Sequence, residues 1–194
     1  VQTNSLRSPN RVNGRWDVYS GEQLRYALSY YSNGDTIYLN GNLNLDGTNV
    51  NWAPLAFSDY GVTLDGGGHT IYNLGMLTDK HGYGALCAAK GSTPITIQNL
   101  TFSNAKVVFH VPARTPSSPG SADGGAGRTG LFAFSGRNAR FEAVHIKNSL
   151  FAQTSPTKKA HGGLGAFGFI VGGSSNLPVI SKCIDQDTIV GGLG

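Results

Sequence analysis

Four acidic residues occupy positions where the sequence could support acid–base chemistry: Asp65, Glu142, Asp185 and Asp187. Neighbouring carboxylates can cleave polysaccharides, one as proton donor and the other as base or nucleophile, and clustered carboxylates also bind calcium. Asp65 precedes three glycines, which is typical of a turn residue. The chain contains internal repeats, which are described below, and the next repeat has no acidic residue at the position that matches Glu142. We therefore expect no catalytic carboxylate pair.

Other catalytic and metal-binding patterns are missing from the sequence. The histidines lack the spacing of a metal site: His69, His81, His110, His145 and His161. The chain has no CxxC pair and no Gly-x-Ser-x-Gly elbow. We expect no catalytic residues, no cofactor and no metal.

The two cysteines, Cys87 and Cys183, allow two interpretations. Cys183 aligns with apolar interior positions, which favours a small buried side chain. A disulfide between them is compatible with an exported protein, although the two residues fall in different repeats. The sequence leaves both interpretations open.

The composition bounds the class of protein. The 194 residues are 39% hydrophobic and only 13% charged, with 28 glycines and a net charge of +4. This is enough apolar material for one domain. The basic residues are dispersed, so we expect no nucleic-acid partner, and no apolar run is long enough for membrane insertion. A chain that opens on Val1, with a polar and weakly charged composition, favours a secreted or extracellular protein at the cell surface.

Three regions follow from local patterns. Residues 1–15 carry arginines without apolar periodicity and predict an extended N-terminal arm. A capping pair, Ser20 with Gln23, and apolar residues at helical spacing predict one helix at about 21–31. Beyond residue 35 the chain alternates short apolar stretches with Gly, Asn and Asp, which predicts an all-β body.

Internal repeats indicate how these strands stack. The stretch beginning at Ile71 aligns with stretches beginning 26, 70 and 109 residues later, at Ile97, Phe141 and Ile180. Such variable spacing with a constant register is typical of solenoid coils separated by loop insertions. The alignment predicts one interior ladder formed by Leu74, Leu100, Val144 and Cys183. It also places Asn104, Asn148 and Asp187 at one turn, where the amides of Asn104 and Asn148 could bond along the stack.

Two motif regions resemble a known family. The run from Val62 to Leu74, VTLDGGGHTIYNL, is similar to the first-coil signature of right-handed parallel β-helix proteins with GLUG repeats. The segment from Gly163 to Gly194 resembles one full GLUG unit, and the stretch from Gly130 to Phe134 resembles the opening of the preceding one. The resemblance covers residues 16–194 and implies a single right-handed parallel β-helix domain with a short N-terminal capping helix.

The same resemblance implies location more than chemistry, because its members are typically bacterial or archaeal surface and secreted proteins, including adhesins. This chain departs from the pattern by a loop insertion at 110–128 and by ending at Gly194, where a further unit would normally begin. We expect a non-catalytic structural or adhesive protein. The alternatives are a polysaccharide-active enzyme, such as a lyase or glycoside hydrolase, and a stalk fragment of a larger adhesin.

These features favour self-association, in which the partner is another copy of the chain. Carbohydrate or a host surface are further candidate ligands. An extended arm can add to an open sheet edge, so subunits could join head to tail into a filament. The residues that we expect at such contacts are Arg7, Arg11, Arg15, Arg114, Val190 and Leu193. Aromatic residues that could stack on sugars are Trp52, Phe57, Tyr60, Tyr72 and Tyr83.

Overall fold

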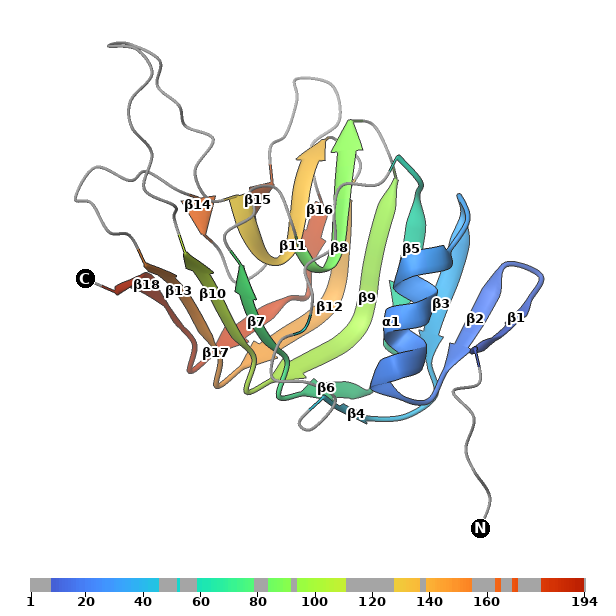
Figure 1. Ribbon diagram of the computed structural model, residues 1–194, viewed down its shortest axis with the longest axis horizontal. Coiled ribbons are helices and arrows are strands. Elements are labelled where there is room, and N and C mark those ends of the chain that lie inside the picture. Colours follow the sequence, from blue (N-terminus) through green and yellow to red (C-terminus); the bar gives the residue numbers. More distant parts are fainter. Residues whose placement is uncertain are drawn as a thin grey trace.

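A computed structural model describes most of the chain as β-sheet with one short helix (Figure 1). The described residues are 8–45, 52, 59–78, 84–91, 94–110, 128–136, 139–154, 163–164, 169–170 and 179–193. The all-β expectation is therefore confirmed.

The largest sheet holds ten strands, and all of its pairs except β1 with β2 are parallel. Its members are β1 (Asn10–Val12), β2 (Arg15–Val18), β3 (Asp35–Leu39), β4 (Leu43–Asn44), β5 (Val62–Asp65), β6 (Thr70–Tyr72), β9 (Ile95–Ser103), β12 (Ala139–Lys147), β16 (Val179–Ser181) and β17 (Ile184–Gln186). Each of the long strands β9 and β12 pairs with two shorter strands that follow one another in the chain. β9 pairs with β5 and β6, and β12 pairs with β16 and β17.

Two further sheets of four strands complete the body. One contains β7 (Gly75–Thr78), β10 (Lys106–His110), β13 (Leu150–Thr154) and β18 (Ile189–Leu193). The other contains β8 (Gly84–Gly91), β11 (Arg128–Gly136), β14 (Gly163–Leu164) and β15 (Phe169–Ile170). From β5 onwards the chain passes through the ten-stranded sheet, then the sheet of β7, then the sheet of β8, and repeats this order. We call each such passage a layer and the succession of layers the stack. Each strand pairs with the corresponding strand of the next layer.

The corner between the first two sheets is formed by residues with left-handed backbone. Asn73, Asn104, Asn148 and Asp187 have φ angles of 59°, 56°, 48° and 51°. Asn and Asp tolerate this conformation because their short polar side chains bond to the local backbone. The predicted alignment of Asn104, Asn148 and Asp187 at one turn is confirmed, since the strands that follow them pair in register.

Side-chain amides link three layers at this corner. Asn104 Nδ2 donates to Asn73 Oδ1 at 2.6 Å, and Asn73 Nδ2 donates to Asn44 Oδ1 at 2.8 Å. No side-chain hydrogen bond joins Asn104 to Asn148 in the described residues. Asn104 reaches the layer of Asn148 through its backbone, from Asn104 N to Lys147 O at 3.1 Å. The amide ladder thus lies one layer earlier in the stack than we expected.

The apolar rows inside the stack confirm most of the predicted register. Phe141 pairs with Ile97 and with Ile180, and Val144 pairs with Leu100, as the 44- and 39-residue spacings predicted. Cys183 packs against the same core. It lies between β16 and β17, both of which pair with β12 in the register that the 39-residue spacing predicts.

Leu74 does not belong to this ladder, so the first predicted spacing is wrong. Ile71 pairs with Phe102, 31 residues later, and not with Ile97, which pairs with Leu64. Leu74 is buried one corner further along the layer, where its carbonyl accepts from Lys106 N at 2.7 Å. Strands with period-two alternation present similar apolar patterns at several offsets, and the segment Gly66–His69 inserts two extra residues opposite β9.

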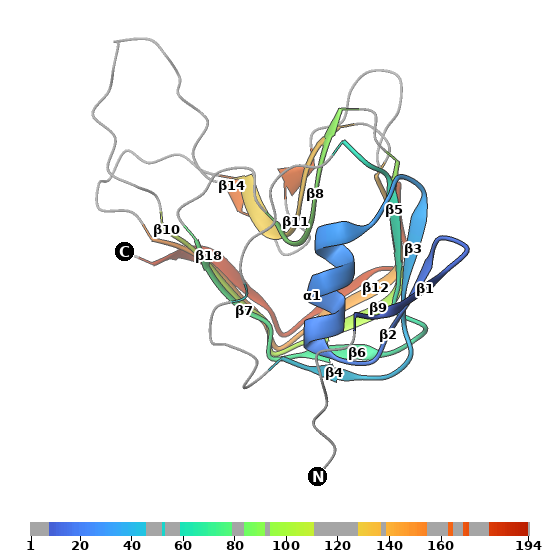
Figure 2. The same cartoon turned by 45° about the vertical axis from the view of Figure 1, so that its right-hand side comes forward.

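The helix α1 (Gly21–Tyr30) covers the core at the N-terminal side, as predicted apart from its last residue. Ser20 caps it, accepting from Gln23 N at 3.2 Å, and Tyr31 is the C-cap. Leu24, Ala27 and Leu28 are fully or almost fully buried. Figure 2 shows α1 in front of the space between the sheets, which fits the expected capping position.

The insertion in Gly66–His69 generates a stability prediction. A Cβ on Gly66 would lie 2.7 Å from Leu100 Cβ and would also meet Asn99 O, so Gly66→Ala forces two layers apart. We expect a loss of about 2–3 kcal/mol in the free energy of unfolding. The matched control is Gly41→Ala, because a Cβ added at Gly41 would meet no atom within 4 Å. Urea denaturation of both variants measures the difference, and equal stabilities would contradict this packing.

Candidate functional site

The outer face of the ten-stranded sheet carries the acidic residues in the most regular arrangement. One outward row crosses six strands, and its members are Asp17, Tyr38, Asp65, Gln98, Glu142 and Ser181. Three of these six side chains are carboxylates, which makes the row the best candidate for chemistry in the described part of the chain.

Asp65 is fully engaged by its neighbours. Its Oδ2 accepts from Gln98 Nε2 at 2.7 Å, and its Oδ1 accepts from Gly67 N at 2.9 Å and from Asn99 Nδ2 at 3.3 Å. These bonds tie the turn after β5 to the next layer. The structure thus supports the predicted role of Asp65 as a turn residue.

Glu142 is held as an ionised carboxylate. Arg140 donates to its Oε2 from Nη2 at 2.8 Å and from Nε at 3.2 Å. The hydrogen bond from Arg140 lowers the pKa of Glu142 below its ordinary value. A general acid works best with a raised pKa, so this shift is opposite to the one that such a role needs.

The two strands that carry Asp65 and Glu142 are farther apart than the carboxyl groups of a retaining pair. Asp65 and Glu142 lie two strands apart with Gln98 between them, which corresponds to about 9.6 Å along the sheet. Retaining glycosidases need about 5 Å, and inverting enzymes need about 6.5–9.5 Å together with one protonated acid. The row is better suited to polar binding than to bond cleavage.

The first end of the row is an ionic cluster on β2 and β3. Arg15 stacks on the ring of Tyr38 at 4.0 Å and donates from Nε to Asp17 Oδ1 at 3.0 Å. Asn40 also donates to Asp17 Oδ1, at 3.1 Å, and this bond is the largest cause of the lowered pKa of Asp17. Arg15, an expected contact residue, is therefore already engaged within the molecule.

The described part of the expected arm is a hairpin and not an extended tail. β1 pairs antiparallel with β2 across Asn13 and Gly14, whose φ angles are 50° and 78°. An Asn-Gly pair with both residues left-handed is the strongest short signal for a two-residue hairpin. This signal was available in the sequence, and the absence of apolar periodicity in 1–15 obscured it.

Arg11 clamps this hairpin to the next layer through Asp35. Its Nη2 and Nε donate to the two carboxylate oxygens at 2.9 and 3.0 Å. Asp35 is 3% exposed and also accepts from Trp16 Nε1 at 2.7 Å and Ser32 N at 2.8 Å. The hydrogen bond from Arg11 is the main reason that the pKa of Asp35 falls to about 2.

The remaining acidic candidates lie in the last described layer, on and after β17. Asp185 and Asp187 are exposed, and Val190 on β18 is 47% exposed. Within the described residues no three His, Cys, Asp or Glu side chains gather into a metal-binding group. His110 meets Thr154 across two paired strands, with Nδ1 and Oγ1 2.8 Å apart.

The aromatic residues divide between core and surface. Trp52 is buried and donates from Nε1 to Ala85 O, whereas Tyr60 and Tyr72 are exposed. An aromatic pair that we did not predict lies on α1, where the rings of Tyr26 and Tyr30 are 4.6 Å apart. Their spacing of four residues was the signal for this pair.

Several expected contact residues lie outside the described residues. These are Arg7, Arg114, the side chain of Leu193, the side chain of Cys87, Phe57, Tyr83 and most of the insertion at 110–128. Cys183 is a free thiol whose Sγ donates to Ser181 O at 3.3 Å, so the structure does not contain the disulfide with Cys87. The loop surface stays a prediction.

The clamp between Arg11 and Asp35 predicts an acid-sensitive N-terminal layer. Asp35→Asn should lower the free energy of unfolding by about 2–3 kcal/mol, because a buried acceptor of charged hydrogen bonds is lost. Asp17→Asn, which alters an exposed ion pair, should cost less than about 1 kcal/mol.

The pKa of Asp35 gives this clamp a defined pH window. Since folding lowers that pKa from 3.8 to about 2, the stabilisation is complete above the unfolded value and disappears as pH falls through the folded one. The wild-type protein should lose about 2 kcal/mol through this group between pH ~5 and ~1, and Asp35→Asn should not show that component. Denaturation midpoints measured across this range test both statements, and identical pH dependence in the two proteins would exclude the clamp.

Comparisons with known proteins found no match for this chain. No protein-family model matches the chain, and no curated protein or solved structure shows a match to it. No helix among the described residues is long and apolar enough to cross a membrane.

Proposed function

We propose that this protein is a non-catalytic, exported structural or adhesive surface protein built as a right-handed parallel β-helix. Support for the architecture comes from strand pairing. Parallel partners follow one another at 33, 44 and 39 residues in the largest sheet, and the chain enters the three sheets in a repeated order. Loops of different length between constant layers are what this architecture predicts.

The resemblance to GLUG-repeat proteins belongs to the same proposal, and the strand pairs agree with it in the sheet but not in the register. The two expected unit openings, near Gly130 and Gly163, belong to strands of one sheet, since β11 pairs with both β14 and β15. Gly163 is paired with Arg128, two residues before the position that the motif comparison predicts. Membership of that family, export and a place on the cell surface are parts of the proposal.

The outward carboxylate row is the observation that carries the non-catalytic part. Asp65 accepts three hydrogen bonds, and Glu142 is paired with Arg140, which lowers the pKa of its carboxyl. A β-helix lyase or hydrolase would need a proton donor or a metal-binding cluster on such a face. The row instead presents amides, hydroxyls and paired charges that can hold a polar surface such as a polysaccharide.

Polysaccharide cleavage is the competing function, and it can be tested directly. The full chain incubated with polyuronates and neutral glycans, with and without calcium, should release neither unsaturated products nor new reducing ends. Glu142→Gln and Asp65→Asn serve as matched variants that remove one carboxylate each. Product formation that disappears in either variant would replace the proposed function with an enzymatic one.

The proposed surface location can be tested by a second measurement. Antibodies against the folded chain should label intact cells that produce the natural protein, and protease added outside those cells should remove the label. A label that appears only after the cells are broken would contradict export.

A further inference from the structure

The outer face of the ten-stranded sheet continues beyond a bend at which Asn99 and Ala143 both have φ angles of 52°. There β6, β9 and β12 lie side by side, and Ile71, Phe102 and Ile146 are fully buried on the inner face. The alternate residues face outward and form two rows across three strands. We call these six residues the β6–β12 patch: Thr70, Thr101 and His145 in one row, and Tyr72, Ser103 and Lys147 in the other.

The spacing of this patch follows from the strand register. Neighbouring strands lie about 4.8 Å apart, so about 9.6 Å separates Tyr72 from Lys147, with Ser103 between them. The two rows are about 6.6 Å apart along the strands. β9 and β12 share eight residue pairs, and strands hold side chains more precisely than loops do. The patch is therefore a rigid and regular surface.

The six side chains of the patch are not engaged with the rest of the protein. Within the described ranges, none of them takes part in a hydrogen bond or an ion pair. On the other side of the bend, by contrast, Asp65 accepts from Gln98 and Glu142 accepts from Arg140. Three hydroxyls, a phenol, an imidazole and an ammonium group of the patch thus remain available to a ligand.

The patch contains a cation and no acidic residue. Lys147 carries a full positive charge and forms no ion pair with any carboxylate that the structure describes. His145 lies two residues away on the same face of β12 and adds hydrogen-bonding ring nitrogens. A cation without a protein partner attracts an anionic group, with which it forms a charge-assisted hydrogen bond.

Tyr72 gives the patch an aromatic surface. It is 38% exposed and lies between Asn44 on β4 and Ser103 on β9. The C–H face of a sugar ring packs on an aromatic ring, and sugar hydroxyls bond to hydroxyl and amide side chains. An anion alone would not use the ring, and a neutral sugar would not use the ammonium group of Lys147. The combination matches a sugar chain that carries acidic groups.

Nucleic acid is the other polymer that combines rings with anions. Its binding depends on several lysines and arginines that neutralise successive phosphates. The patch offers one lysine against three hydroxyls, and the basic residues of the chain are dispersed. The balance of groups therefore favours a sugar chain.

We propose that the β6–β12 patch binds an acidic polysaccharide, with a sugar ring stacked on Tyr72, a sugar hydroxyl bonded to Ser103 and an anionic substituent held by Lys147. The proposal rests on the proposed adhesive function and names its class of ligand. Carboxylate and sulfate present the same chemistry to Lys147, because its ammonium group is a compact charge that needs no planar partner. Thr101 and His145 form the adjoining row and bond to the next sugar of the chain.

Binding to immobilised polymers tests this site. The 194-residue chain should bind polygalacturonate, a sulfated galactan or both, and its affinity should fall as salt rises. Neutral galactan should bind at least about tenfold more weakly, since it lacks the charge-assisted bond. The tighter of the two acidic polymers identifies the anion. Single-stranded oligothymidylate, which has rings and anions but no acidic sugar, should bind no better than neutral galactan.

Substitutions at two positions remove the groups that hold the ligand. Lys147→Gln and Tyr72→Ala should each weaken binding of the acidic polymer on the order of tenfold. Lys147→Arg and Tyr72→Phe keep the charge and the ring, so these variants should retain most of the affinity. Both side chains face outward, and an unchanged circular dichroism spectrum and melting temperature would confirm that the variants fold.

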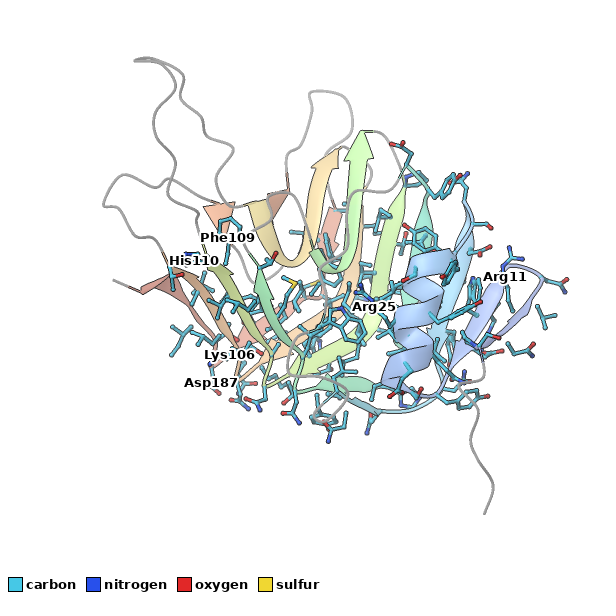
Figure 3. All side chains as sticks on the ribbon, viewed as in Figure 1. Arg11, Arg25, Lys106, Phe109, His110 and Asp187 are labelled. Carbon is cyan, nitrogen blue, oxygen red and sulfur yellow. The ribbon has the colours of Figure 1, made fainter. Side chains whose placement is uncertain are left out.

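Lys106→Gln is the matched control, because it removes one exposed positive charge from the neighbouring sheet. Figure 3 shows Lys106 at the lower end of β10, which follows the corner at Asn104. This variant should change the affinity by less than about twofold, as expected for a solvent-exposed charge outside the site.

Four results would overturn the proposed site: no binding to either acidic polymer, equal binding of neutral galactan, tighter binding of oligothymidylate, or equal effects of Lys106→Gln and Lys147→Gln. None of them alters the cleavage assay. Product formation in that assay would overturn the non-catalytic function even if the patch binds its ligand. Failure of the site and failure of the proposed function are therefore distinguishable.

Discussion

Parallel backbone pairing between successive layers is the interaction on which the rest of this structure depends. Each strand can satisfy its N–H and C=O groups only if the next passage of the chain arrives in the same direction and register. That demand fixes where each layer must bend, and the left-handed residues at Asn73, Asn104, Asn148 and Asp187 supply the bend at one corner. Once the corners are aligned, apolar side chains form continuous rows, and insertions are confined to the segments between strands.

Pairing also explains what the sequence could and could not predict. The match of Ile97, Phe141 and Ile180 was recoverable because apolar, polar and turn positions agreed over a whole strand and its corner. The position of Leu74 was not, because a shorter strand followed by a two-residue insertion fits several registers equally well. Helix α1 was predictable from its cap and periodicity, which are local signals.

The candidate site shows the same division between local and distant information. Asp65 could be interpreted as a turn residue from the glycines beside it, and its bond to Gly67 agrees. The clamp of Arg11 on Asp35 joins residues 24 positions apart and has no sequence pattern of its own. Sequence reasoning therefore assigned Arg11 to an intermolecular contact, whereas the fold uses its charge to hold the hairpin against β3. The outward carboxylate row likewise emerges only when the strands are placed side by side.

The unequal overlap between layers has a mechanical consequence. Hydrogen bonds between layers point along the stack, so tension applied along that direction loads the junctions in series and the weakest one yields first. β9 and β12 overlap along nearly all of their nine residues, whereas β2 and β3 share four residue pairs and β12 shares three each with β16 and β17. The stack would therefore fray from its ends under load, while its middle would act as the rigid part of the molecule.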